Sequence, residues 1–185
     1  MGNHEWLLLL ARLPSTPSSL RVTVWRRMRA AGAVMLHSGA WVLPLSPKNQ
    51  QVMDDCLSYV KSQDGKGAII SGKSQGEESD EDIVKRFIAA TDEEYAEFDE
   101  RCLSLMEEIR RESGQEKFTF AELDENEEDL QKLTSWLRKI RARDFFGSSR
   151  SANAIEALER CRNELQTFEK AVYRKEGLDA ADDSS

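Results

Sequence analysis

The chain has 185 residues, a mass of 21.1 kDa and a net charge of −8, with 39% hydrophobic and 32% charged residues. This length supports one or two domains with a buried core and excludes a disulfide-stapled miniprotein. No apolar run approaches the roughly 20 residues that a membrane-spanning helix needs. The short run 6–10 lacks the basic segment and cleavage site of a signal peptide, so we expect a cytoplasmic protein.

Charge is unevenly distributed along the chain. Residues 1–76 hold 9 Lys and Arg against 4 Asp and Glu, a net of +5, and residues 77–131 hold 6 against 21, a net of −15. Residues 132–176 return to +5, with 11 against 6, and the tail 177–185 carries three Asp. An anionic partner is therefore expected to meet the first or the third block.

The first block alternates short apolar runs with helical patterns. A continuous apolar run is typical of a strand buried on both faces, and residues 5–13 form such a run, closed by Pro14. Apolar spacing predicts a helix over 20–31 that Gly32 ends. A hairpin (33–36 and 40–45), a helix opened by Pro47 (47–63) and a last strand (68–71) follow. This βαββαβ order predicts a ferredoxin-like module over 1–76, an antiparallel sheet with two helices on one face.

The rest of the chain is predicted to be helical. Residues 72–80 are polar and glycine-bearing and are interpreted as a linker. Thr91 and Thr119 each precede a Glu by three residues, a capping-box pattern, and Ser151 precedes a third apolar stripe that starts at Ile155. The sequence thus predicts an antiparallel three-helix bundle over 77–176 and a disordered tail over 177–185. The expected fold class is α+β.

No motif specifies an enzyme. Residues 67–74 match the G-x-x-x-x-G-K-[ST] pattern of a phosphate-binding loop, but their apolar interior is typical of a strand and no helix pattern follows directly. His4 and His37 lie at a terminus and in a turn, away from other metal-ligating side chains. Cys56, Cys102 and Cys161 are widely spaced and are expected to be reduced, buried thiols. We therefore expect no catalytic residues, no metal and no cofactor.

Two basic clusters remain as candidate sites. The first helix carries arginines that could contact DNA phosphates, although an ordinary solvated face explains them equally well: Arg21, Arg26, Arg27 and Arg29. A second set lies around a turn between two helices and could bind an oxyanion, with Arg143 alternatively paired to a carboxylate: Arg141, Arg143, Ser148, Ser149 and Arg150.

Several motifs, in order, resemble the N-terminal domain of ChrB, a family of bacterial chromate-resistance regulators. The residues that carry the resemblance are Trp6–Leu10 with Leu13–Pro14, Arg21–Arg27, Gly32–Ala33, Trp41–Pro44, Phe87 with Asp92–Tyr95, and Trp136–Phe145. The resemblance implies control of chromate-efflux genes in answer to chromate. Longer members carry a C-terminal domain that this chain does not reach. The first block also resembles the module shared by PaaX-type repressors and Cas2 nucleases, but its first strand lacks the aspartate that would bind a catalytic metal.

These observations lead to two hypotheses. The first is a non-enzymatic regulator of chromate resistance, acting in transcription, with promoter DNA and chromate as partners. The second is an interaction module whose long helices bind another subunit: a second copy of this chain, or a separate sensor domain of the ChrB C-terminal type. The acidic isoelectric point of about 5.0 slightly favours the second hypothesis, because DNA-binding domains are usually basic.

Overall fold

The computed structural model describes residues 4–75 and 79–178. Within them the chain forms four strands and five helices: β1 (Trp6–Arg12), α1 (Ser19–Ala30), β2 (Val34–His37), β3 (Ala40–Pro44), α2 (Pro47–Ser62), β4 (Lys66–Gly72), α3 (Asp80–Gly114), α4 (Phe120–Arg143) and α5 (Ser151–Lys175). The chain divides into two compact units, the first formed by residues up to Thr91 together with Arg143–Gly147, the second by Asp92–Ala142 and Ser148 onward.

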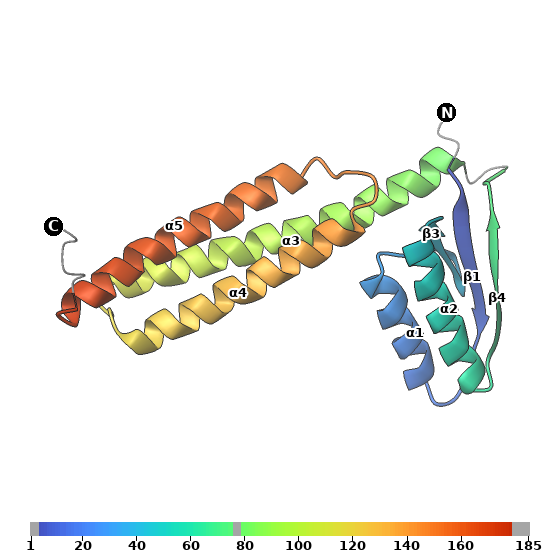
Figure 1. Cartoon of the computed structure of the whole chain (residues 1–185), viewed down its shortest axis with the longest axis horizontal. Helices are drawn as coiled ribbons and strands as arrows, with labels where there is room; N and C mark the ends of the chain where they lie inside the picture. Colours follow the sequence, from blue (N-terminus) through green and yellow to red (C-terminus); the bar gives the residue numbers. More distant parts are fainter. Residues whose placement is uncertain (1–3, 76–78, 179–185) are drawn as a thin grey trace. The chain divides into compact units, whose positions relative to one another are not determined.

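The first unit contains the predicted βαββαβ arrangement, and the α+β fold class is confirmed. Its four strands form one antiparallel sheet in the order β2-β3-β1-β4, and α1 and α2 cover one face of that sheet (Figure 1). Ser46 caps α2 by accepting a hydrogen bond from the Asn49 N–H at 3.1 Å. The hydrophobic core under the helices is made of fully buried side chains: Leu7, Leu9, Met28, Leu43, Met53 and Val60.

The prediction that β1 is buried on both faces is wrong for part of the strand. Leu7 and Leu9 face the helices, but on the opposite face Leu8 is half-buried and Leu10 is 40% exposed. Other parts of that face are covered: Val42, opposite Leu8, is fully buried, and Trp6 stacks on Phe87 of α3 with ring centroids 5.8 Å apart. The apolar run therefore predicted the strand correctly, but it predicted more burial of the second face than the structure shows.

The helix α3 begins earlier than the capping pattern predicts. Thr91 is buried inside α3 and its hydroxyl donates to the Phe87 carbonyl at 2.9 Å, so it caps nothing. Ser79 caps the helix instead, accepting a hydrogen bond from the Asp82 N–H at 3.2 Å. As a result the compact units divide at Thr91, fifteen residues beyond the predicted boundary at residue 76.

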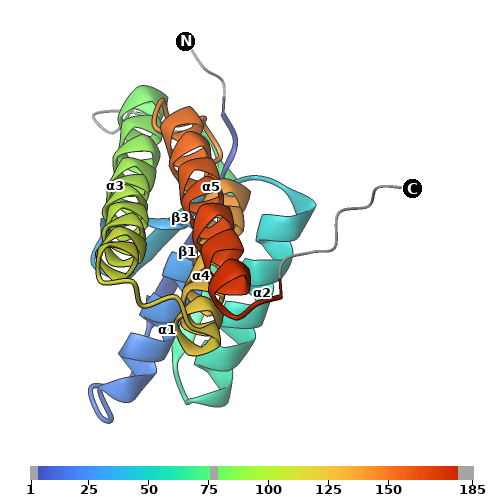
Figure 2. The same cartoon turned by 90° about the vertical axis from the view of Figure 1, so that its left-hand side faces the viewer.

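The second unit is the predicted bundle of three antiparallel helices, α3 from Asp92, α4 and α5 (Figures 1 and 2). Its core holds the predicted apolar stripes, except that Ile155 is exposed. The Thr119 pattern does mark a helix start, because its hydroxyl accepts from the Glu122 N–H at 3.3 Å. Of the predicted tail, only Gly177 and Leu178 lie within the described residues.

Over the described ranges, no helix is both long enough and apolar enough to cross a membrane. In the same ranges no group of three or more His, Cys, Asp or Glu side chains is placed to hold a metal ion. The phosphate-loop pattern at 67–74 coincides with β4 itself, as its apolar interior predicts. The ring of His4 packs against the rings of Trp6 and Phe146.

Candidate functional site

The arginines of α1 have different surroundings. The helix buries Val24 and Met28 against the sheet, which leaves Arg21, Arg26 and Arg27 exposed. Arg29 was predicted to be exposed as well, but it is half-buried in the structure.

Arg27 has a structural contact of its own. Its guanidinium lies 4.2 Å from the ring centre of Tyr59 on α2, a cation–π contact between the two helices. Arg21 and Arg26 are therefore the α1 arginines that are exposed without a cation–π contact among the described residues.

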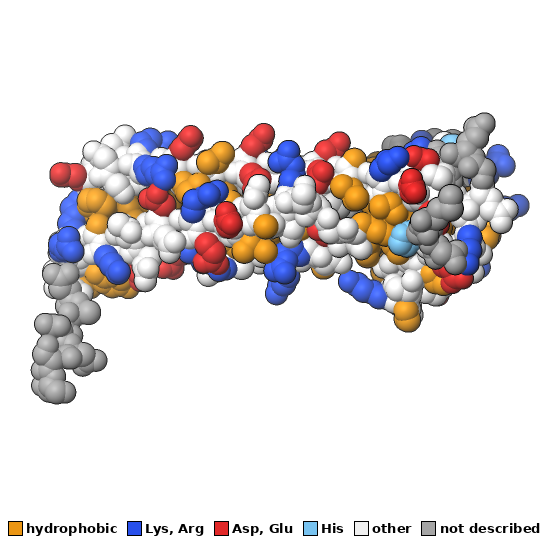
Figure 3. All heavy atoms as spheres, turned by 90° about the horizontal axis from the view of Figure 1, so that it is seen from above, with side chains coloured by type: hydrophobic (Ala, Val, Ile, Leu, Met, Phe, Trp, Pro, Cys, Tyr) orange, Lys and Arg blue, Asp and Glu red, His pale blue; other side chains and the backbone are white. Residues whose placement is uncertain are grey.

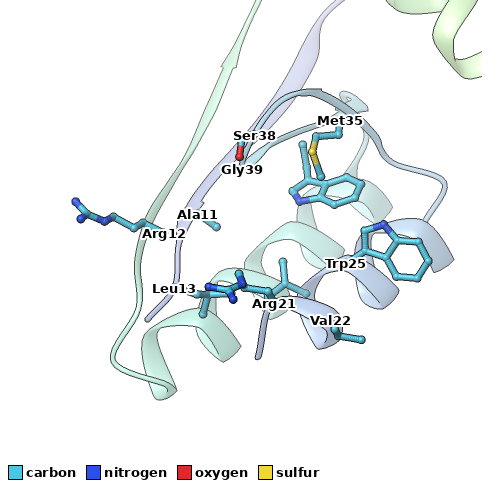
Figure 4. Close-up of a pocket in the computed structure, with 11 residues that line it drawn as sticks. Ala11, Arg12, Leu13, Arg21, Val22, Trp25, Met35, Ser38 and Gly39 are labelled. Atoms are coloured by element: carbon cyan, nitrogen blue, oxygen red, sulfur yellow. The ribbon is translucent and has the colours of Figure 1, made fainter. Parts of the chain in front are cut away.

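An open groove of about 660 Å³ runs beside α1 (Figure 4). It lies between α1, the last residues of β1 and the β2–β3 hairpin. The Trp25 indole is 50% exposed at its rim, while Trp41 is buried. In Figure 4 the Arg21 side chain lies near Leu13 inside the groove, and Arg12 extends away from Trp25. The remaining lining residues are Ala11, Val22, Val24, Met35, Ser38 and Gly39.

Gly39 fixes the hairpin wall of this groove. Its φ of +80° is in the left-handed region, and a Cβ there would lie 2.9 Å from the Ala11 carbonyl oxygen. The Ala11 N–H in turn donates to the Gly39 carbonyl at 3.1 Å. A glycine is therefore required for the hairpin turn to pack this closely on the end of β1.

The chemistry of the groove suits an anion that carries an aromatic ring. The Arg21 guanidinium lies in it, whereas that of Arg12 extends outward from its edge, and no carboxylate is among the described residues that line it. Guanidinium groups bind phosphates through charge-assisted hydrogen bonds, and an exposed indole can stack on a nucleobase. Sequence reasoning identified Arg21 beside Trp25, but it missed Arg12, Met35 and Trp41, which only the folded sheet brings to α1.

The residues of the second predicted cluster are divided between the two compact units. Arg143 belongs to the first unit, where its Cβ faces Gly32, whereas the other four residues belong to the second. Ser148 is buried; its hydroxyl donates to the Asp92 carboxylate and accepts from the Arg150 N–H at 3.0 Å. The hydroxyl predicted to bind an oxyanion is thus already paired with an anion.

Three members of that cluster, Arg141, Ser149 and Arg150, are exposed. Ser149 and Arg150 are exposed at the start of α5. Arg141 lines a separate groove of about 520 Å³ between α4 and α5, together with Arg138 and Arg162. Arg162 pairs there with Glu159.

Comparison with known proteins identifies the chain's relatives. The family model described as "Protein ChrB, N-terminal" matches residues 21–178. Protein ChrB of Cupriavidus metallidurans is 32% identical over 93 residues, which are 50% of this chain and 28% of that protein. No solved structure matches. Because the family model covers most of the chain, including α1 from Arg21 onward and all three helices of the bundle, this chain belongs to the ChrB N-terminal family.

Proposed function

We propose that this chain is a non-enzymatic regulatory protein of chromate resistance that acts in transcription by binding promoter DNA through α1 and the adjoining groove. Membership in the ChrB N-terminal family supports the role in chromate resistance. The observation that carries DNA binding is the groove lined by Arg21 and Trp25, whose described lining residues include no carboxylate, on the helix that also carries the exposed Arg26.

The arrangement separates two kinds of contact. Arg21 and Arg26 place positive charge where it can contact the phosphates of the DNA backbone. Contacts of this kind account for most of the affinity of protein–DNA complexes. Trp25 supplies an exposed ring for stacking or apolar contact. Figure 3 shows acidic and basic side chains interspersed on the visible face of the helices, a surface less suited to a polyanion than the groove of the first unit.

Chromate enters this proposal as the signal. It reaches the regulator either directly or through a sensor domain of the ChrB C-terminal type, which is one proposed partner of the chain. The aligned part of this chain spans only 28% of the ChrB relative, so that a sensor elsewhere in such a protein is compatible with the proposal.

The test is binding of the purified chain to DNA from upstream of its own operon, followed by fluorescence anisotropy at several salt concentrations. We expect affinity to fall steeply as salt rises, because bound cations are released from each neutralised phosphate. The double variant Arg21→Glu, Arg26→Glu should lose binding with an unchanged melting temperature. Lys170→Glu, a charge reversal at an exposed position on α5, should retain it.

A second candidate function is an interaction module that recruits another subunit. Leu103 on α3 is 53% exposed, and residues 77–131 carry a net charge of −15, two features of a surface that suits a basic, partly apolar partner. If the wild-type chain binds promoter DNA no better than the double variant does at any salt concentration, the DNA proposal is overturned and this one is favoured.

A further inference from the structure

The two edge strands of the sheet, β2 and β4, differ in how readily each could pair with a strand of another chain. The edge strand β2 has only four residues, and its register with β3 shifts between Met35 and His37. Arg86 Nη1 lies 3.5 Å from the carbonyl oxygens of both Met35 and Leu36. Short length, irregular register and a cationic side chain are the usual means by which an edge strand is kept from pairing with another chain.

The edge strand β4 is neither short nor irregular, and its one cationic residue, Lys66, lies at its first position. Its seven residues, Lys66–Gly72, pair with β1 in continuous register and include no proline. Among the described residues no strand pairs with its other side, and Figure 1 shows β4 as the last strand of the sheet. A long, regular and uncovered edge offers a row of backbone donors and acceptors to a further strand.

An exposed apolar stripe lies beside this edge. Ile70 is 50% exposed and lies opposite Leu8, and Ala68 lies opposite the 40% exposed Leu10. Directly opposed residues of antiparallel strands share a face, so all four side chains lie on the face that α1 and α2 do not cover.

We propose that the β4 edge is an interface with a second copy of this chain, in which the two β4 strands pair antiparallel about a two-fold axis at Ile69. This inference goes beyond the proposed function and does not depend on it. The pairing joins two four-stranded sheets into one, with α1 and α2 of both copies on the same face. An interface of this kind is isologous, the commonest symmetry of soluble dimers.

The sequence of β4 selects this register. With the axis at Ile69 all seven residues pair, Lys66 lies opposite Gly72, and Ala68 lies opposite Ile70. If the second copy shifts by one residue, so that Lys66 lies opposite Lys73, two lysines face each other. Such a shift also places the helix-covered face of one copy on the same side as the open face of the other. In the Ile69 register, by contrast, the exposed stripe continues from one copy into the next.

Mixed cross-linking tests the register. Ala68→Cys and Ile70→Cys are prepared as separate full-length variants and oxidised with oxidised glutathione, alone and as an equimolar mixture. Directly opposed Cβ atoms lie about 4.5–5.5 Å apart and diagonal ones about 7–8 Å, so the mixture should give a disulfide-linked dimer and neither variant alone should do so. Wild type, whose three cysteines are buried, is the background control.

Molar mass in solution tests the interface itself. By light scattering the wild type should be a dimer, and Ile70→Lys should weaken dimerisation at least tenfold while keeping the circular-dichroism spectrum of the wild type. Leu45→Lys, which adds the same charge at an exposed apolar site away from β4, should remain dimeric. A monomeric wild type, or cross-linking no greater in the mixture than in the single variants, would overturn the proposal.

Discussion

The Trp6 indole donates a hydrogen bond to the Asp80 carboxylate, with Nε1 and Oδ1 2.8 Å apart. The same carboxylate accepts from the His4 N–H at 3.1 Å, which ties the start of β1 to the first residue of α3. Because of this contact, the first turns of α3 belong to the sheet-containing unit although the preceding segment reads as a linker.

The Trp6–Asp80 hydrogen bond predicts a pH-dependent contribution to stability. It lowers the pKa of Asp80, helped by the His4 N–H and opposed by partial burial. A carboxyl whose pKa is lowered by folding stabilises the fold above its unfolded pKa, and this stabilisation is lost as pH falls through the folded value. Asp80→Ala should therefore lower the melting temperature at pH 7, and the difference from wild type should vanish in acid.

Trp6→Phe is the partner variant for that prediction, since it keeps an aromatic ring but removes the N–H donor together with part of the buried indole. If the hydrogen bond is responsible, the effects of Trp6→Phe and Asp80→Ala will not add in the double variant. The melting temperatures are measured by circular dichroism. If the two single variants lower the melting temperature by amounts that add in the double variant, Asp80 stabilises only the N-terminus of α3 and its hydrogen bond to Trp6 contributes nothing.

The aromatic cluster around Phe87 predicts a large loss on truncation. Phe87 is buried, stacks on Trp6 and meets the Phe145 ring edge-on with centroids 5.8 Å apart. Phe87→Ala should lower the free energy of unfolding by about 3–5 kcal/mol, the usual cost of deleting a buried phenyl ring. Urea denaturation measures this change in the free energy of unfolding. Phe120→Ala, at an exposed ring that contacts Tyr173, should cost only about 0.5–1.5 kcal/mol.

The order of strands and helices could be predicted because it depends on local signals. Apolar runs marked the strands, and Gly32, with φ of +80°, marked the end of α1. Capping boxes were less decisive. Thr119 starts a helix after a turn, but Thr91 follows the buried residues Ile83 and Phe87 on the same helix, so an identical local pattern lies mid-helix. The helix starts earlier because Ser79 caps it through the Asp82 N–H, and the contact of Phe87 with Trp6 holds its first turns against the sheet.

The candidate site was predictable only in part for the same reason. Arg21, Trp25 and Arg26 are close in sequence and lie on one helix, so helical periodicity brings them together. Arg12 and Met35 reach the groove through strand pairing. Gly32 likewise shows a long-range constraint, since a Cβ there would lie 2.6 Å from that of Arg143.

A buried carboxylate in the bundle predicts a stabilising substitution. Burial raises the pKa of Glu112, as do the nearby Glu122 and Glu108, while the Asn126 Nδ2–H, 2.7 Å from Glu112 Oε2, opposes the shift. A carboxyl whose pKa is raised by folding costs stability once pH rises through the folded value. Glu112→Gln should therefore raise the melting temperature at pH 7 and change it little near pH 4.

Glu107→Gln is the control for Glu112, because it removes the same charge from an exposed position on α3. Its melting temperature should follow wild type at both pH values. An equal gain in the two variants would show that the net negative charge of the helix, and not burial of Glu112, is what destabilises the bundle.

The three cysteines predict slow thiol chemistry. Cys56, Cys102 and Cys161 are buried and free, and burial raises the pKa of Cys56, which reduces its reactive thiolate. A polar disulfide reagent should modify none of them rapidly in the native chain and all three after unfolding in guanidinium. Rapid modification of any one in the native protein would contradict the buried assignment.

The start of α5 predicts that the described residues bind chromate no better than sulfate. An oxyanion site there needs the Ser148 hydroxyl and the Arg150 N–H, but these groups bond to Asp92 and to each other. The Arg150 guanidinium is also close enough to the buried Asp99 carboxylate to oppose the rise in its pKa. Calorimetric titration of the full chain with chromate should give no heat above that of sulfate, an isosteric dianion. Chromate-specific heat that disappears in Arg150→Ala would show instead that the turn opens to bind the anion.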